Sequence, residues 1–246
     1  MELSDVDSVE ASAVGADGLD ATDSARLTRL VEYIASFSPR VILSTLLALD
    51  HGDESRGALW DRCIFDHGAV FLFPTDAEAM RKHLATAGFR LGATVPSVVV
   101  QRRVCTRYGL DTDSYRIHIV HARRRHPGSP GLDQRIEIFF PVTSAAHPWA
   151  REDERRHNRE THFAFAVEGL DSSTYLNMRR ELAESAGMVP DGGGFNPHDR
   201  NHGPGCSTFY FAGPGTMGEH PWPRRLELVC GGRLESALAA HSAPRP

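Results

Sequence analysis

Residues 65–73 read Phe-Asp-His-Gly-Ala-Val-Phe-Leu-Phe, and residues 161–167 read Thr-His-Phe-Ala-Phe-Ala-Val. Both runs are rich in aromatic and β-branched residues, a composition typical of β-strands. Each run carries a histidine near its start, His67 in the first and His162 in the second. The recurrence of this pattern predicts an internal repeat, and the repeat decides the expected fold.

The segments that follow the two strands come in the same order. After the first strand, the sequence predicts an amphipathic helix over residues 76–87 that ends at Gly88, then extended segments at about 89–106, 115–122 and 134–140. After the second, it predicts a helix over 172–186, a Gly/Pro/Asn-rich loop over 190–205, and strands over 206–212 and 225–230. The predicted fold is therefore α+β, with two βαβββ modules.

The chain is expected to divide around these modules. The predicted segments are a disordered N-terminus (1–23), accessory helices packed on the main domain (24–60), module 1 (61–141), a linker (142–160), module 2 (161–232) and a C-terminal tail (233–246). The first accessory helix is expected to begin after Asp23-Ser24, and the second to cover about 40–49.

Composition excludes several classes of function. The chain has 246 residues and a net charge of −5, which argues against nucleic-acid binding because phosphate contacts need a basic surface. The short basic run at 123–125 is expected to be a solvated loop, with a carboxylate or phosphate contact as the alternative. No secretory signal is recognisable, and no stretch reaches the about 18 apolar residues of a membrane span. Four scattered cysteines without a CxxC pair predict a reduced, cytoplasmic location, and assembly into a homo-oligomer is left open.

Four residues occupy matching places in the two repeats. His67 and His162 lie near the start of each first strand, and Glu137 and Glu227 lie within each last strand, at separations of 137 − 67 = 70 and 227 − 162 = 65. Each glutamate is flanked by apolar residues, so its side chain faces the opposite side of the strand from theirs. A single strand histidine or glutamate is commonly structural or solvated, but four in equivalent positions favour convergence on one divalent cation.

These residues resemble a known superfamily. Asp66-His67-x-Ala, His162-Phe-Ala-Phe and the closing Leu-Glu-Leu strand are similar to motifs of the vicinal oxygen chelate superfamily, over roughly residues 65–230. The resemblance implies paired βαβββ modules that form a half-open barrel around a metal. It does not extend to the N-terminal helices.

A further motif resembles the type I extradiol ring-cleaving dioxygenases within that superfamily. Residues 201–211, Asn-His-Gly-Pro-Gly-Cys-Ser-Thr-Phe-Tyr-Phe, resemble their loop and aromatic strand, although Gly213 and the long interval 216–224 depart from the pattern. The resemblance implies Fe(II) held by His67, His162 and Glu227, and a catecholic substrate cleaved with O2. It assigns acid–base catalysis to His202 and a hydrogen bond to the substrate to Tyr210. A plain Gly/Pro loop entering a strand is the alternative.

Two other functions remain open at this stage. Lyases and isomerases such as glyoxalase I and methylmalonyl-CoA epimerase use ligands in the order His, Glu or Gln, His, Glu, which this chain matches if Glu137 is a fourth ligand to Ni, Co, Zn or Mn. Bleomycin-resistance-like members sequester a ligand without a metal, which leaves both histidines unexplained. His118 and His121 are expected to face opposite sides of a strand, and His198 is expected to be exposed.

Overall fold

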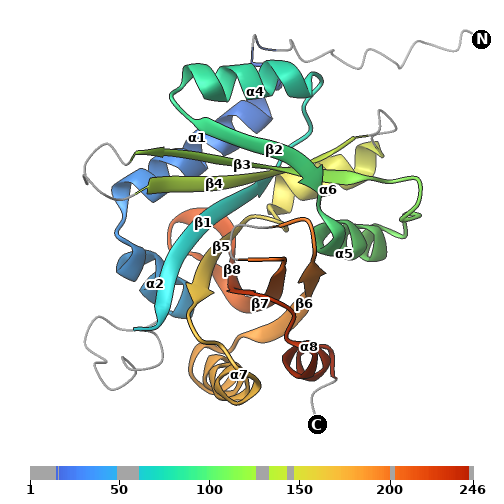
Figure 1. Cartoon of the computed structure of the whole chain (residues 1–246). Helices are drawn as coiled ribbons and strands as arrows, with labels where there is room; N and C mark the ends of the chain where they lie inside the picture. The colour runs from blue at the N-terminus through green and yellow to red at the C-terminus, as the bar shows by residue number, and fades with distance from the viewer. Residues whose placement is uncertain are drawn as a thin grey trace, which may run out of the picture.

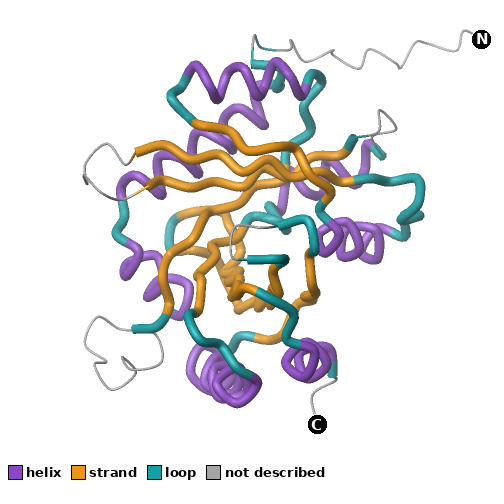
Figure 2. The backbone as a smooth tube through the Cα atoms, viewed as in Figure 1, coloured by secondary structure: helices purple, strands orange, loops and turns teal. Residues whose placement is uncertain are grey.

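The computed structural model describes residues 15, 17–48, 61–125, 133–142, 147–199 and 203–243. In these residues the chain is mixed α+β, with seven helices arranged around an eight-stranded mixed sheet (Figures 1 and 2). The strands are β1 (Cys63–Phe71), β2 (Arg90–Pro96), β3 (Ile117–Arg125), β4 (Asp133–Pro141), β5 (His162–Val167), β6 (Val189–Asn196), β7 (Cys206–Met217) and β8 (His220–Gly231). The helices are α1 (Ala21–Ser36), α2 (Pro39–Leu47), α4 (Ala77–Thr86), α5 (Val98–Tyr108), α6 (Pro148–His157), α7 (Ser172–Ala186) and α8 (Glu235–Ser242).

The strand order is β2-β3-β4-β1-β5-β8-β7-β6, and the strands of each half follow the same order outward from the central pair β1–β5. β1 pairs in parallel with β4, β5 pairs in parallel with β8, and the two halves join through the antiparallel pair β1–β5. The second half has the predicted β-α-β-β-β order, whereas the first half contains an additional helix, α5, between β2 and β3. The two halves are thus related by an approximate two-fold arrangement of their strands.

The two faces of the sheet are packed differently. Alternate strand residues such as Ile136, Ile138, Leu226 and Leu228 belong to the main core, together with apolar side chains of α1, α2, α4 and α7; we call this the outer face. The residues between them point to the opposite, inner face. In the first half, the inner face packs against α5 in a second apolar cluster, whose members are Ala69, Phe71, Phe73, Val100, Val104, Cys105, Tyr115, Ile117, Ile119 and Phe139.

The N-terminal helices are part of the main core. Leu30 of α1 and Leu46 of α2 are fully buried in it, which confirms the predicted packing on the main domain. The prediction of disorder over 1–23 is wrong for residues 17–23, because Leu19 is fully buried and Asp20 caps α1 through the backbone N–H of Asp23. Residues 1–14 lie outside the described part.

No single helix in the described residues is long and apolar enough to cross a membrane. α1 and α2 reach the required length and composition only when taken together, and they are bent by 111° at the break between them. Their apolar side chains are those buried in the main core.

Helix α5 corrects the expectation of an extended segment over 89–106. Only Arg90–Pro96 forms a strand, and Val98–Tyr108 is helical. The run of valines at 98–100 favours a strand by local propensity, but Val100 and Val104 are one helical turn apart and pack together into the second cluster. Burial of this helical face therefore overrides the intrinsic preference of the residues.

Strand β6 corrects the expectation of a loop over 190–205. A Cβ on Gly193 would lie 2.5 Å from the backbone oxygen of Thr208, and one on Gly194 would lie 3.2 Å from Val99 of α5. These glycines allow close packing between strands and under α5, and do not mark a turn. The Gly/Pro-rich pattern therefore predicts a loop where residues 189–196 form a strand.

Two other connecting segments are also helical. The predicted linker 142–160 contains α6, which Pro148 begins and whose Glu154 is buried. The predicted C-terminal tail contains α8, whose Ala237 and His241 are buried. Both helices have charged or small residues with little apolar periodicity, so their formation depends on the tertiary contacts that bury these few side chains.

Candidate metal centre

The pairing register places the four candidate ligands in equivalent positions. Ala69 is the partner of Glu137 across β1 and β4, and Ala164 is the partner of Glu227 across β5 and β8. His67 and His162 each lie two residues before these alanines. Across β1 and β5, His67 pairs with Ala164 and His162 pairs with Ala69. The sequence repeat therefore corresponds to a spatial repeat centred on the β1–β5 junction.

All four side chains lie on the inner face and are buried. Their exposed fractions are 4% for His67, 6% for Glu137, 0% for His162 and 2% for Glu227. A register shift between Phe65 and His67 marks a bulge just before the first histidine, a feature that redirects side chains. Behind it, Gly68 leaves room for α1, because a Cβ there would lie 2.5 Å from the end of the Ile34 side chain.

Three atoms of the cluster point at one another without hydrogen bonds. The Nε2 atoms of His67 and His162 lie 3.4 Å and 2.8 Å from Oε2 of Glu227. Among the described residues, none of these three atoms has a hydrogen-bond partner of acceptable geometry. Buried polar atoms are nearly always satisfied, so three such atoms in one place require an explanation.

The other ring nitrogens fix the tautomers. Nδ1 of His67 lies 2.9 Å from the Asp66 carboxylate, and Nδ1 of His162 lies 2.7 Å from the backbone oxygen of Glu160. A carbonyl oxygen or carboxylate can only accept, so each Nδ1 carries the hydrogen and the neutral ring presents a lone pair at Nε2. Two lone pairs then face a carboxylate oxygen, an arrangement that is repulsive unless a cation or added proton lies between them. Metal-bound histidines are held by acceptors in this way.

The electrostatics of the cluster also demand positive charge. Burial lowers the pKa of His67, but the carboxylates of Glu137, Asp66 and Glu227 outweigh this and raise the pKa well above its ordinary value. Burial raises the pKa of Glu227, but its contacts with His162 and His67 outweigh this and lower it. Without a bound cation, the carboxylates therefore retain a proton on an imidazole.

The chemistry of this donor set fits a divalent transition metal. One ligand atom from each of His67, His162 and Glu227 lies within 4.8 Å of the others. Two imidazole nitrogens and a carboxylate oxygen suit Fe(II), Zn(II), Co(II) or Ni(II), and three protein ligands leave coordination positions open.

A second cluster adjoins the first through Glu137. His121 on β3, Glu137 and Asp199 bring their ligand atoms within 4.8 Å of one another. Oε1 of Glu137 lies 2.9 Å from His121 Nδ1, and Oε2 lies 3.2 Å from His67 Nε2. Glu137 is thus shared between the two clusters. His121 faces inward, whereas His118 packs near Phe140 on the outer face, which confirms that the two histidines face opposite sides.

Of the two predicted catalytic residues, Tyr210 lies beside the candidate ligands and His202 lies outside the described residues. Tyr210 is the register partner of Glu227 and packs edge-on against His162, with ring centroids 5.1 Å apart. The guanidinium of Arg103 lies 3.9 Å from the centroid of the tyrosine ring. Burial and the Glu227 carboxylate raise the pKa of Tyr210 well above its ordinary value, so the phenol keeps its proton. His202 lies outside the described residues, and His198 is exposed, as predicted.

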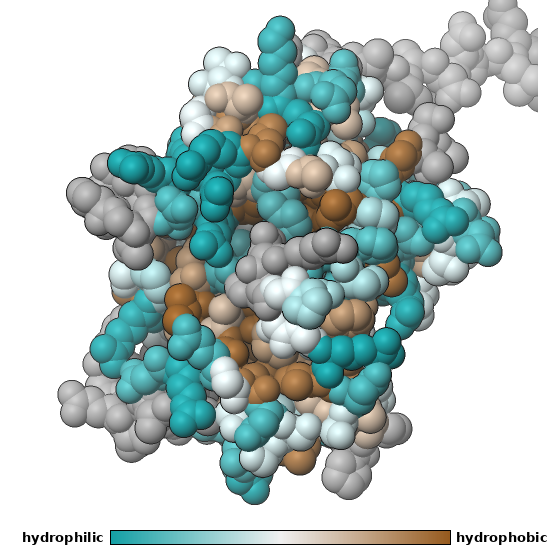
Figure 3. Space-filling model, in the orientation of Figure 1, coloured by the Kyte–Doolittle hydropathy of each residue, from teal (hydrophilic) through white to brown (hydrophobic). Residues whose placement is uncertain are grey.

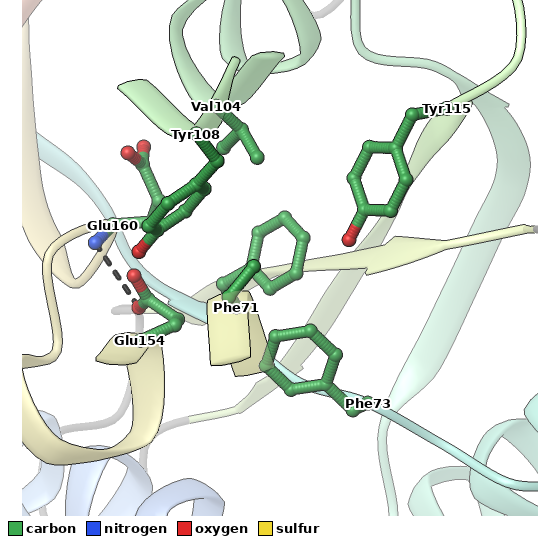
Figure 4. A pocket seen from close by; sticks show the side chains of 8 residues that line it. Phe71, Phe73, Val104, Tyr108, Tyr115, Glu154 and Glu160 are labelled. Atoms are coloured by element: carbon green, nitrogen blue, oxygen red, sulfur yellow. Dashed lines mark hydrogen bonds between the residues drawn. The ribbon is translucent and has the colours of Figure 1, made fainter. Parts of the chain in front are cut away.

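Glu160 anchors the part of α5 that packs against Tyr210. Its buried carboxylate accepts hydrogen bonds from Arg103 on α5 and from Arg107 one turn further along. Burial raises the pKa of Glu160, but these arginines outweigh it and lower the pKa to about 2. Figure 4 shows Glu160 and Glu154 beside aromatic side chains around a void of only about 10 Å³, which holds at most one water molecule. The residues around this void therefore leave no room for a larger ligand between them.

A larger cavity opens on the other side of the cluster. It has a volume of about 340 Å³ and is lined by His67, Glu137 and His121, together with residues of β2, β3 and β4 further out. Tyr210 and His162 are not among the described residues that line it. This cavity gives access to the cluster from the His67–Glu137 side.

Comparison of the chain with known protein families, curated protein sequences and solved structures found no match.

Sequence reasoning assigned no role to Asp66, Glu160, His121 or Asp199. Asp66 directly precedes a candidate histidine ligand, and an acidic residue at that position is a usable signal for a second-sphere acceptor. Glu160 accepts the hydrogen bond of His162 with its backbone oxygen. Every residue has this atom, so the sequence gives no signal for the contact. His121 and Asp199 meet only because β3 pairs with β4 and the segment after β6 returns to them.

Asp66→Asn is expected to weaken divalent-metal binding by about 10–100-fold, the usual effect of altering a second-sphere partner. The amide removes the negative charge that orients the His67 ring and raises its basicity, while the three proposed ligands stay in place. Equilibrium titration with Co(II) measures the change. Asp171→Asn is the matched control, because Asp171 caps the distant helix α7 and asparagine caps equally well. Equal affinities in both variants and the wild type would rule out a role for Asp66.

Proposed function

We propose that this chain is an Fe(II)-dependent extradiol dioxygenase that cleaves the ring of a small catecholic substrate with O2. In this proposal the two halves of the sheet form a half-open barrel of the vicinal oxygen chelate type around the metal. His67, His162 and Glu227 hold the metal. The observation that carries the proposal is the convergence of the two Nε2 atoms and a carboxylate oxygen, all buried and without a hydrogen-bond partner among the described residues.

The donor set supports a metal that binds a substrate and O2 together. Fe(II) held by two histidines and one carboxylate would leave coordination positions open for a catechol and O2. The chain's own residues position it: Asp66 and the backbone oxygen of Glu160 orient the two imidazoles. Phe139 of the apolar cluster under α5 packs near His162, with ring centroids 6.0 Å apart, and so supplies an apolar surface beside the site.

The acid–base and substrate-binding roles rest on the resemblance of residues 201–211. His202 is proposed to take a catechol proton and return it, because an imidazole titrates near neutral pH. Tyr210 is proposed to hydrogen-bond the substrate, and its position beside His162 and Glu227 supports a place near the metal. The four free cysteines support the proposed cytoplasmic location.

A metal-dependent lyase or isomerase is the second candidate, and Glu137 favours it. Its Oε2 lies 3.2 Å from His67 Nε2, in the position that Glu227 occupies in the other half. A fourth protein ligand would suit Ni(II), Co(II), Zn(II) or Mn(II) and reactions that move a proton without O2. The other oxygen of Glu137 contacts His121, so Glu137 is shared between the proposed metal ligands and the adjoining cluster. A metal-free ligand-sequestering protein, the third candidate, gives no functional role to the two buried histidines.

The decisive experiment compares the wild type with Glu137→Gln. Protein reconstituted anaerobically with Fe(II) is mixed with a panel of catechols, and oxygen uptake and ring-cleavage products are followed. In the dioxygenase, Glu137→Gln is expected to keep Fe(II) and most of the ring cleavage, because Glu137 is not a required ligand. The control is His67→Gln, which should abolish both.

Turnover that needs no O2, is supported by Ni(II), Co(II) or Zn(II), and is lost in Glu137→Gln would establish the lyase or isomerase instead. A wild type without a bound metal and with a bound small molecule would favour sequestration.

A further inference from the structure

Three arginines from neighbouring strands lie in one row of the sheet. Arg90 on β2 is the register partner of Arg123 on β3, and Arg123 is the partner of Arg135 on β4. Arg123 and Arg135 are each two residues from the inward-facing His121 and Glu137, so they lie on the same inner face. Figure 3 shows hydrophilic side chains gathered over these ends of β2, β3 and β4, at the left of the view.

The arginine row and the metal cluster line the same cavity. All three arginines contribute to the cavity of about 340 Å³ that also contains His67, Glu137 and His121. Two residues along a strand span roughly 7 Å, so the arginine row lies roughly 7 Å along the sheet from His121 and Glu137. A ligand of the size of a substituted benzene ring can therefore contact both ends of the cavity.

The charge of this row is not balanced by the sheet around it. Arg135 donates to Asp66, whereas Arg90 and Arg123 have no ion pair or hydrogen bond within the described residues. Like charges directly opposite one another on adjacent strands are destabilising. Elsewhere on the inner face the arginines are paired, as Arg103 is with Glu160. Among the described residues, Arg90 and Arg123 are thus an unneutralised basic pair in a protein of net charge −5.

The acidic groups of the cavity neutralise Arg135 of the row and leave Arg90 and Arg123 without a carboxylate among the described residues. Asp66 is held by Arg135 and His67, and Glu137 is shared by His67 and His121. Both carboxylates lie at the metal-cluster end. The cavity therefore has one end that suits a cation and one end that suits an anion.

We propose that the substrate carries a carboxylate, which Arg90 and Arg123 bind while the substrate's adjacent oxygens face the metal cluster. This inference rests on the proposed function for the oxygen end of the substrate, but the arginine end is independent of the metal. Guanidinium groups bind carboxylates through paired, charge-assisted hydrogen bonds, which fix orientation as well as affinity. The substrate class is accordingly a carboxylated catechol.

The test compares two probes that differ in charge. 3,4-Dihydroxybenzoate and the neutral 4-methylcatechol are titrated calorimetrically, without O2, into the full-length protein loaded with Fe(II). The wild type is expected to bind 3,4-dihydroxybenzoate at least about tenfold more tightly, the effect of one modest charge-assisted contact. This preference should fall to near unity in the Arg90→Gln/Arg123→Gln double variant, and it should weaken at high salt.

Arg125→Gln is the matched control, because Arg125 lies two residues further along β3 and does not line the cavity. It should keep the preference. The double variant is expected to be no less stable than the wild type, because it relieves like-charge repulsion. Urea unfolding of both proteins checks this, so that a loss of binding is separated from a loss of folding.

The outcomes separate this inference from the proposed function. A preference for the carboxylate in metal-free protein, lost in the double variant, supports the inference even if no catechol is cleaved. Ring cleavage with equal affinity for both probes would leave the dioxygenase standing and overturn the inference. A preference that persists in the double variant, or no binding of either probe, would also overturn it.

Discussion

His67→Ala, His162→Ala and Glu227→Ala are each expected to weaken divalent-metal binding by more than about a hundredfold. Each change removes one of three converging ligand atoms and leaves the remaining two to hold the cation. The loss of several kcal/mol follows because the binding free energy of a metal site derives from its full ligand set. Titration of each variant with Co(II), followed by its visible absorption, measures the affinity.

His83→Ala is the control for these variants, because His83 is an exposed histidine on the distant helix α4. It should bind the metal as the wild type does. Metal binding by the wild type should weaken as the pH is lowered, because the raised pKa of His67 means that a proton competes with the metal for its Nε2. A ligand variant with wild-type affinity would show that its residue is wrongly assigned.

Glu160→Gln is expected to destabilise the protein by about 3–5 kcal/mol at pH 7, the usual cost of removing one partner of a buried ion pair. The amide leaves Arg103 and Arg107 without a carboxylate at the junction between α5 and the start of β5. The free energy of unfolding in urea measures the loss. Glu152→Gln is the control, because Glu152 forms an exposed pair with Arg156 on α6 and should change stability by less than about 1 kcal/mol.

The difference between Glu160→Gln and the wild type should depend on pH. The folded-state pKa of Glu160 is lowered to about 2, so its charge stabilises the fold above the ordinary glutamate pKa. This stabilisation is lost as the pH falls from that value through about 2. A variant as stable as the wild type at pH 7 would show that the arginines are satisfied by other groups.

The sequence was sufficient for the positions of the proposed ligands, because they recur in a repeat. One histidine lies in the first strand of each repeat and one glutamate in its last strand. The pairing register of β1 with β4 and of β5 with β8 shows that these four residues occupy equivalent positions in the two halves. The helices at 77–86 and 172–186 were also predictable, since each has an aspartate N-cap and a glycine soon after its end.

What the sequence could not provide was the outcome of competition between local preference and tertiary packing. Val98–Tyr108 has strand-like valines but forms a helix, because Phe71 and Phe139 offer an apolar surface to its Val100–Val104 face. Gly193 and Gly194 indicate a turn but lie in a strand, because α5 and β7 approach too closely for a side chain. The arginine row likewise appears only when three separate strands are brought into register.

The most direct test of the central claim is the metal content of the full-length protein, purified without oxygen, loaded with Fe(II), freed of excess metal and analysed by plasma mass spectrometry. A site made by His67, His162 and Glu227 predicts one equivalent of iron per chain in the wild type and less than about a tenth of that in the His67→Ala/His162→Ala double variant. A wild type that retains no divalent metal, or a double variant that retains as much as the wild type, would contradict the claim.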